Sequence, residues 1–450
     1  MTAGRRGSPA RAPMARRRGY AQARRADTGA PAAPLVSLTL SSSSRPRYAI
    51  PADVPVFLVV ALAVRLILAP LTEGWDFYAD ARSVALSLHG YDVYALSRTA
   101  FQLPWTYLPL CLHLLAALQW VAGVTGLPFR VLGKLPVVAA DLGIGYLLFA
   151  ALRRRGESES IAILGMALYL FNPLALLNGA LLGRFDAIAL VFLLLALEWY
   201  TTRLFAPFYG LAIAAKTFPI FLLPLLLLGR DRQKPRRLLL ALLLVPLLSL
   251  PYVVTDPRGL LGYLFYDAHS RWLGRLSWYY LLPHAGSLST ALTVARVGTL
   301  LFPLTLLLVV HRPLYVKAAC TFVLFVALNR LVYEQYLVWS LPFLIVVGLR
   351  HRSRLALWLF ALYTIAGMLE NEQTWDAFDP RFHYSVIPTP SLLLNGLLAV
   401  SALLFIAAQA LHGRRLPWRR HTPAATQAQP TLVMASAGGQ ARPFLSRSDP

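Results

Sequence analysis

The stretch SLLLNGLLAVSALLFIAAQAL, residues 391–411, carries no charged side chain and is followed by the basic cluster Arg414–Arg420. A helix of about 20 apolar residues is long enough to cross the hydrocarbon core of a bilayer. Its backbone polar groups bond to one another within the helix, which is required because lipid offers them no partners. We therefore predict a transmembrane helix that ends at a basic membrane surface.

Apolar runs of similar length recur from Val54 to Leu411. Of the 450 residues, 57% are hydrophobic and only 14% are charged, too little charge for the surface of a soluble protein of this size. The predicted fold class is all-α, a polytopic transmembrane helical bundle with roughly 10–12 membrane segments.

The chain divides by composition into three parts. We predict a disordered basic cytoplasmic tail at 1–50, a transmembrane domain at 51–412 and a second disordered basic cytoplasmic tail at 413–450. The basic residues behind the net charge of +23 lie in these tails and in short clusters between apolar runs, so topology explains them better than nucleic-acid binding. The expected location is the cell membrane, with both termini cytoplasmic and no nucleic-acid partner.

Lys and Arg concentrate on the cytoplasmic side of membrane proteins, and this rule orders the segments. The cluster Arg153–Arg155 falls on that side if the apolar runs 108–125 and 207–228 are re-entrant or broken rather than full crossings. Lys216, in the middle of the second run, favours such a break. The rule then places three loops outside, namely 72–107, 255–288 and 371–390.

Metal and nucleotide motifs are absent from the sequence. Cys111 and Cys320 both lie in apolar stretches, and they form neither a disulfide framework nor a metal-ligand spacing. There is no HExxH or CxxC motif. There is also no phosphate-binding GxxxxGKS or GxxxxGKT loop, so the sequence gives no sign of a protein driven by nucleotide hydrolysis. We predict no metal site and no required cofactor, although paired carboxylates leave room for a divalent cation.

The first exterior loop contains two carboxylates, Asp76 and Asp80, which share one face of a helix because they are four residues apart. Carboxylates at a membrane surface can act as a general base or hold a cation. An ordinary solvated loop with a capping aspartate is the alternative. The neighbouring Trp75, Phe77 and Tyr78 could wall in the pair, which favours a functional site.

Two further sets of charges interrupt apolar runs. Arg184 and Asp186 lie at the junction of two runs, and Lys216 has about ten apolar residues on either side. Ionisable residues at such depth usually face a cavity or a partner. For Lys216 the alternative is a side chain that reaches the membrane interface along its own stem.

The exterior loop 255–288 interleaves His269 and Arg271 with aromatic residues. Guanidinium groups bind phosphate oxygens in pairs, and aromatic rings anchor at headgroup level, so this pattern suits a phosphate at the bilayer surface. Binding of lipid headgroups without catalysis is the alternative. The polar segment Tyr333–Tyr336 either forms a packing network or lines the same cavity.

The chain order of these motifs carries a resemblance to a known family. The motifs are Asp76, Asp80-Ala-Arg82, Gly90-Tyr-Asp-Val-Tyr94, Tyr107-Leu-Pro-Leu110, Gly133-Lys134, Asp141-Leu142, Asn172-Pro173, Arg184 with Asp186, Gly210 to Lys216 to Pro219, and Asn329-Arg330 with Gln335-Tyr336-Leu-Val-Trp339. Their order over roughly Asp76 to Pro342 resembles the GT-C superfamily of membrane glycosyltransferases, in particular the catalytic subunit of GPI mannosyltransferase I. One departure is that the family's Asp-x-Asp is replaced by Glu73, Asp76 and Asp80.

The resemblance implies a mannosyltransferase or a related hexosyltransferase that moves a sugar from a polyprenyl-phosphate donor to a hydroxyl of a lipid or glycan acceptor at the outer membrane face. Such chemistry needs a base for the acceptor proton and cations for the leaving phosphate, and a single displacement inverts the anomeric centre. We assign the base to Asp76, with Asp80 as orienter or substitute base. Donor phosphate-binding residues are Lys216, Arg271 and His269, and other substrate-site candidates are Arg82, Arg184, Asp186 and Gln335.

Two other functions fit some of these features. A multi-pass transporter or lipid flippase without transferase activity would also have broken helices and buried charges, usually in two related halves. No internal repeat is visible in the sequence. The other is a non-catalytic scaffold subunit, a function that does not explain the charged residues Asp76, Lys216 and Arg271.

Overall fold

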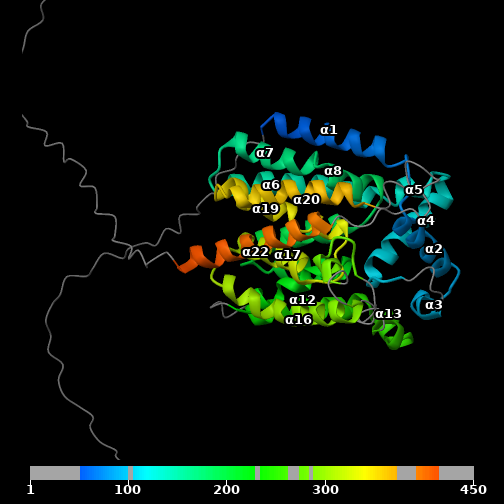
Figure 1. Ribbon diagram of the computed structural model, residues 1–450. Helices are drawn as coiled ribbons and strands as arrows, with labels where there is room; N and C mark the ends of the chain where they lie inside the picture. Colours follow the sequence, from blue (N-terminus) through cyan, green and yellow to red (C-terminus); the bar gives the residue numbers. More distant parts are fainter. Residues whose placement is uncertain are drawn as a thin grey trace, which may run out of the picture. The chain divides into compact units, whose positions relative to one another are not determined.

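The computed structural model describes residues 51–99, 105–228, 234–261, 273–282, 287–371 and 392–414. Within these ranges every regular element is a helix and there is no strand, which confirms the predicted all-α class (Figure 1). The predicted tails lie outside the described residues, except for residues 413 and 414, which belong to the last helix. Residues 100–104, 262–272, 283–286 and 372–390 of the loops predicted to be exterior also lie outside them.

The first half of the chain forms helices of very different lengths, from 4 to 20 residues. They are α1 (Asp53–Leu68), α2 (Trp75–Leu88), α3 (Val93–Thr99), α4 (Pro109–Thr125), α5 (Phe129–Leu132), α6 (Leu135–Arg154), α7 (Glu159–Leu170), α8 (Pro173–Leu176), the π-helix η1 (Leu177–Leu181), α9 (Asp186–Glu198) and α10 (Phe205–Ala215).

The second half continues the bundle. Its helices are the 3-10 helix η2 (Phe218–Leu222), α11 (Leu223–Leu227), α12 (Lys234–Leu248), α13 (Leu250–Thr255), η3 (Trp278–Leu281), α16 (Leu288–Leu306), η4 (Leu307–Val309), α17 (Leu314–Leu328), α18 (Glu334–Val338), α19 (Leu341–Arg350), α20 (Arg354–Leu369) and α22 (Leu392–Arg414).

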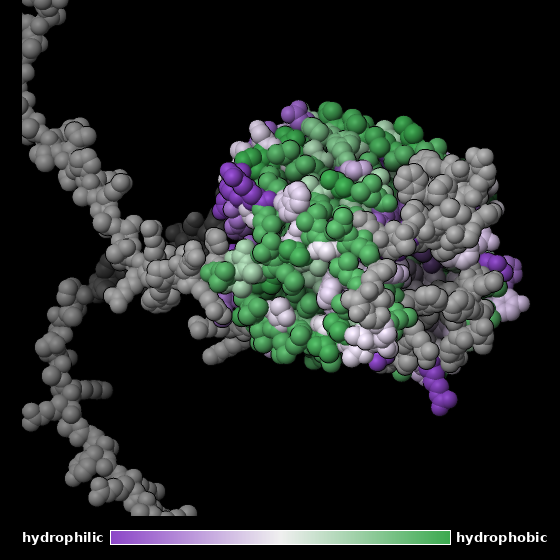
Figure 2. Space-filling model, in the orientation of Figure 1, coloured by the Kyte–Doolittle hydropathy of each residue, from purple (hydrophilic) through white to green (hydrophobic). Residues whose placement is uncertain are grey.

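Three of the described helices are long and apolar enough to cross a membrane, namely Phe129–Arg154, Leu288–Val309 and Leu392–Leu411. The pair Glu159–Leu170 and Pro173–Leu181, bent by 47°, is a fourth if it counts as one span. Large apolar side chains of α16 point outward, Leu300 with 74% exposure, and hydrophobic residues cover much of the face drawn in Figure 2. Exposed apolar surface on this scale fits contact with lipid.

The apolar run 207–228 is broken at Lys216, as predicted. Helix α10 ends at Ala215, Lys216 is extended with φ −156° and ψ 138°, and η2 begins two residues later. Pro219 contributes to the break because it has no N–H group for an α-helical hydrogen bond. The other doubtful run folds as the continuous helix α4.

Two basic clusters from distant parts of the sequence meet at one end of the bundle. The carboxylate of Glu157 accepts from Arg350 at 2.8 Å and from Arg352 at 3.1 Å. At the same ends of α6 and α9, Arg155 pairs with Glu198 at 2.9 Å. This arrangement matches the prediction that Arg153–Arg155 lies on the same side as the later basic residues. We call this region the basic end.

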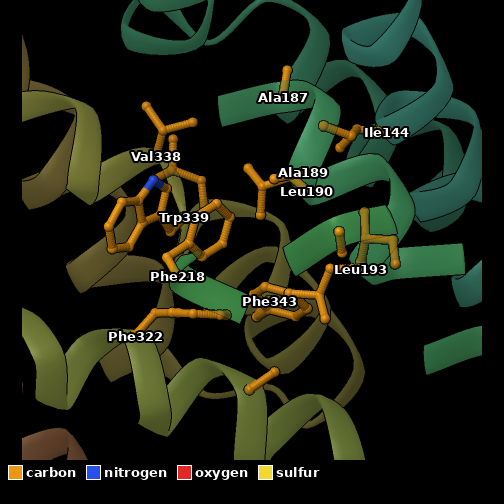
Figure 3. Packing of buried hydrophobic residues seen from close by; sticks show 14 of the residues in the cluster. Ile144, Ala187, Ala189, Leu190, Leu193, Phe218, Phe322, Val338, Trp339 and Phe343 are labelled. Atoms are coloured by element: carbon orange, nitrogen blue, oxygen red, sulfur yellow. The ribbon is translucent and has the colours of Figure 1, made fainter. Parts of the chain in front are cut away.

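A cluster of aromatic side chains packs between η2, α17 and the turn after α18. The ring of Trp339 stacks on Phe218 with centroids 4.3 Å apart, and Phe322 packs edge-on against both rings (Figure 3). These residues come from η2, α17 and the turn between α18 and α19, and α9 packs beside them through Leu190. The core therefore fixes the broken helix, α9 and α18 relative to one another.

Candidate functional site

A buried arginine joins three distant segments of the chain. The Nε atom of Arg184 donates to Asp76 Oδ2 at 2.8 Å, and Nη1 donates to Glu334 Oε1 and to Asn178 Oδ1, each at 2.7 Å. Asp76 belongs to α2, Glu334 to α18, and Asn178 to η1. The site residue predicted at Asp76 therefore lies against Arg184, which was also predicted.

The local backbone explains why Arg184 reaches this position. The π-helix η1 widens the turn before it, and the backbone N–H of Arg184 donates to the carbonyl of Asn178 at 2.9 Å. Gly183 then adopts φ +73°, which favours glycine, and a Cβ atom there would lie 2.6 Å from the ring of Phe77. The chain thus turns sharply under α2 and directs the guanidinium at Asp76.

The charge of Arg184 is maintained by its partners. Burial acts to lower the pKa of Arg184, but the carboxylates of Glu334 and Asp76 outweigh it and raise the pKa above its ordinary value. Removing one member of such a buried network costs about 3–5 kcal/mol, because the other charge is left without compensation. The network therefore depends on all of its members.

A second ion pair forms at the break in the run 207–228. Lys216 Nζ lies 2.8 Å from Asp186 Oδ2, and Trp339 Nε1 donates to Asp186 Oδ1 at 2.5 Å. The ammonium also lies 5.3 Å from the centre of the Tyr107 ring. Lys216 is 7% exposed, so it faces partners inside the protein rather than reaching the interface along its stem.

Asp80 is the carboxylate of this region without a bonded partner. It is 6% exposed, and within the described ranges its side chain makes no hydrogen bond or ion pair. Burial, followed by the charge of Asp76, raises the pKa of Asp80 well above its ordinary value, while Lys216 acts in the opposite direction. A buried carboxyl with a raised pKa, placed among other charged groups, is a candidate for proton transfer.

Tyr107 lies close to both the Arg184 network and the Lys216–Asp186 pair. Burial raises the pKa of its hydroxyl, and the charges of Asp80, Asp76 and Asp186 add to this effect. All three carboxylates therefore act on one phenol, which places the Arg184 network and the Lys216 pair within electrostatic range of each other. Tyr94 holds the backbone of Tyr107, since its hydroxyl donates to the Tyr107 carbonyl at 2.8 Å. We call this region the site cluster; it comprises Asp76, Asp80, Tyr107, Asn178, Arg184, Asp186, Lys216, Glu334 and Trp339.

The other predicted residues make no hydrogen bond or ion pair with this cluster in the described part of the chain, or lie outside it. Arg82 is exposed on α2, and it has no hydrogen bond or ion pair with any residue that the structure describes. Gln335 follows Glu334, and its buried Oε1 atom has no partner in the described part of the chain. His269 and Arg271 lie outside the described residues.

Four members of the site cluster were not among the predicted site residues. Two of them, Tyr107 and Trp339, were quoted only within the family motifs. Glu334 lies in the polar segment Tyr333–Tyr336, for which packing and cavity lining were both considered, and it joins the cluster through Arg184. Asn178 was not singled out. Its signal is a single amide within an otherwise apolar stretch, 174–182, directly before the charged junction.

The chemistry available to the site cluster follows from its charges. Four carboxyls face two cations, so a proton acceptor is present together with hydrogen-bond donors for an anion. No group of three or more His, Cys, Asp or Glu side chains that could hold a metal ion occurs in the described ranges. Proton transfer and binding of an anion are therefore among the tasks that these side chains can support.

The similarity of this chain to known proteins is found among solved structures. No protein-family model matches the chain, and no curated protein matches it. Among solved structures, the chain is similar to ArnT from Cupriavidus metallidurans, in a crystal structure bound to undecaprenyl phosphate. The two chains are 16% identical, 81% of this chain and 78% of that chain are covered, and the TM-score is 0.45.

Proposed function

We propose that this protein is a membrane glycosyltransferase that moves a sugar from a polyprenyl-phosphate donor to an acceptor hydroxyl at the outer membrane face, with mannose as the expected sugar. The observation that carries the proposal is Asp80, a buried carboxylate without a bonded partner in the described residues, set beside the Asp76–Arg184 pair and near Lys216. The order of the sequence motifs supports the same class of reaction.

We assign the base to Asp80 and an orienting role to Asp76. The sequence alone favoured the reverse assignment. However, Oδ2 of Asp76 is already bonded to Arg184, whereas Asp80 has no such partner. A raised pKa also suits Asp80 to the task, because a base works best when its pKa is near the operating pH.

The transfer step follows from this assignment. The acceptor oxygen forms a bond to the anomeric carbon of the sugar while its proton passes to Asp80. The bond between the anomeric carbon and the phosphate oxygen breaks, and polyprenyl phosphate leaves with the electron pair. One displacement of this kind inverts the anomeric centre.

Lys216 is the proposed phosphate ligand. In the described residues its ammonium makes one hydrogen bond, to Asp186, and contacts the Tyr107 ring, which leaves donors for a phosphate oxygen. Because carboxyls outnumber cations in the site cluster, an arriving phosphate needs more positive charge. We propose that His269 and Arg271 supply it.

The test is transfer by purified protein in lipid nanodiscs. Wild type is incubated with radiolabelled polyprenyl-phosphate mannose, or with other polyprenyl-phosphate sugars, together with a membrane lipid extract. We expect a labelled lipid or glycan product, and Asp80→Asn should lower its rate by roughly 10²–10⁴-fold while still binding donor. The control is Asp53→Asn, the same change at an exposed aspartate, the first residue of α1.

Two outcomes contradict the proposal. Failure of wild type to form product from any donor tested would reject transferase activity. Equal transfer by wild type and Asp80→Asn would reject the assignment of the base. Movement of the donor lipid between leaflets without transfer would favour the flippase alternative.

A further inference from the structure

Lys134 is a fully buried lysine next to the site cluster, at 0% exposure, and it precedes α6. Its Nζ atom donates to three backbone carbonyls, those of Ala69 at 2.8 Å, Thr72 at 2.5 Å and Leu181 at 2.6 Å. An ammonium group has three N–H donors. All of them are used, so this cation has none left for a phosphate.

The three carbonyls belong to the ends of two structural segments. Ala69 follows the last residue of α1, and Leu181 is the last residue of η1. Carbonyls at helix ends lack hydrogen-bond donors within the helix and carry partial negative charge. A buried lysine supplies those donors, and the carbonyls in turn stabilise its positive charge. Thr72 begins the first exterior segment. One side chain therefore ties that segment to the end of η1.

Both tied segments lead directly into the site cluster. Asp76 lies four residues after Thr72, and Arg184 lies three residues after Leu181. These two residues form the 2.8 Å ion pair that crosses from α2 to the junction before α9. The contacts of Lys134 thus set the distance between the two backbones that the pair must bridge.

The ring of Phe77 adds a second constraint from the same lysine. Lys134 Nζ lies 5.5 Å from the centre of this ring, and Phe129 stacks on it at 5.7 Å. A Cβ atom at Gly133 would lie 2.8 Å from the ring, and one at Gly183 would lie 2.6 Å from it. Phe77 is 1% exposed, so its close fit against these neighbours fixes the rotation of α2, and with it the direction of Asp80.

We propose that Lys134 is a positioning residue for the transfer reaction, an inference that rests on the proposed function. Its ammonium holds residues 72–76 and 181–184 at the separation that pairs Asp76 with Arg184, and its contact with Phe77 orients α2 so that Asp80 faces the acceptor. It does not bind the donor. A shift of about 1 Å at a catalytic group costs roughly 10²-fold in rate, which is the effect that a positioning residue prevents.

The test compares Lys134→Met with Lys134→Arg in nanodiscs, measuring kcat and the KM for donor separately. Arginine keeps the charge, but its planar guanidinium cannot direct three donors at three carbonyls as an ammonium does. Positioning therefore predicts that both variants lose kcat by roughly 10²-fold with KM for donor nearly unchanged. If arginine restores kcat, or if both variants raise KM at unchanged kcat, Lys134 acts through its charge on the substrate and the proposal is overturned.

If neither Lys134→Met nor Lys134→Arg folds, a milder substitution tests the same inference. Phe77→Leu keeps an apolar side chain but removes the ring, and we expect a loss of kcat of at least about 10-fold with donor KM unchanged. Wild-type kcat in Phe77→Leu would contradict the positioning of α2.

A stability measurement separates this inference from the proposed function. In wild type, Asp76→Asn should lower the Tm because Arg184 loses a partner. In the Phe77→Leu background the same change should lower the Tm by less than half as much, because the pair is already misaligned. Equal shifts in both backgrounds would overturn the positioning role. A wild type without transfer activity would reject the proposed function and leave this comparison interpretable.

Discussion

The two ends of the bundle hold the same kinds of charged residue in different states. At the basic end, Glu157 and Glu198 each contact two arginines, and Arg352 is 64% exposed on its side chain. In the site cluster, four carboxyls share two cations, and Asp80 is buried without a bonded partner in the described residues. Helix α9 joins the ends, since it begins at Asp186 and ends at Glu198.

The difference between the ends indicates which one is functional. Each acid at the basic end is buried but pairs with two partly exposed arginines, so those contacts need no further explanation than topology. The site cluster retains a buried, uncompensated carboxyl, which costs stability. Natural proteins accept such a cost mainly where chemistry requires it.

The largest expected difference in stability concerns arginine. Arg184→Met should lower the free energy of unfolding by about 3–5 kcal/mol, because Glu334 is left buried, and Asp76 half-buried, without their cation. Arg352→Met at the basic end should cost less than about 1 kcal/mol, because Arg352 is exposed and Glu157 keeps Arg350 as a partner. Denaturation of both purified variants in detergent measures this. Equal losses would remove the distinction between the two ends.

Glycine substitutions give the next comparison. Gly183 and Gly156 both have positive φ, +73° and +84°, but only Gly183 has side chains within 4 Å of the added Cβ. Gly156→Ala should cost about 1–2 kcal/mol from backbone strain alone. Gly183→Ala should cost about 2–5 kcal/mol, because the methyl group also meets Phe77. Equal Tm values for the two variants would contradict the close packing of Phe77 against Gly183.

Two lysines lie over tyrosine rings at the same distance, 5.3 Å, one at each end. Lys216→Met should weaken the binding of radiolabelled polyprenyl phosphate by about 10–100-fold, since a hydrogen bond to a charged group contributes about 1.5–3 kcal/mol. Lys234→Met, which alters the lysine over Tyr200, should leave binding unchanged. Similar losses in both variants would mean that binding reflects general positive charge.

The smallest expected effect concerns Asp80 and pH. Its pKa is raised in the folded protein, so between about pH 3.9 and that raised value the folded state holds more protons than the unfolded state. Its contribution to the free energy of unfolding therefore falls as pH rises through this interval. Asp80→Asn should then be more stable than wild type at neutral pH, by on the order of 1 kcal/mol, with the gain lost below about pH 4.

The matched variant at the basic end should behave in the opposite way. Glu157→Gln loses two ion pairs, so it should be slightly less stable than wild type at neutral pH. Thermal melts in detergent at several pH values measure both variants. A destabilised Asp80→Asn protein would show that the carboxylate is compensated after all.

Local patterns in the sequence predicted the parts of the fold that depend on local chemistry. Lys216 within an apolar run indicated the break after α10, and the spacing of Asp76 and Asp80 placed both on one side of α2. The same periodicity accounts for Arg82, which is two residues from Asp80 and therefore lies on the opposite side, exposed.

Contacts between distant segments could not be predicted from one sequence. The pair of Arg184 and Glu334 is separated by 150 residues, and no local pattern indicates which arginine will meet which acid. The role of Lys134 was hidden for another reason. Its partners are backbone carbonyls, which every residue has, so the sequence carries no mark of them.

The central claim is that Asp80 is a base with a raised pKa, and the pH dependence of kcat/KM for transfer by wild type tests it most directly. The rate should fall as the pH is lowered through a midpoint well above about 3.9, the ordinary pKa of an aspartate. The residual rate of Asp80→Asn should not show this midpoint. A wild-type rate that stays constant down to about pH 4, or an unchanged midpoint in Asp80→Asn, would contradict the claim.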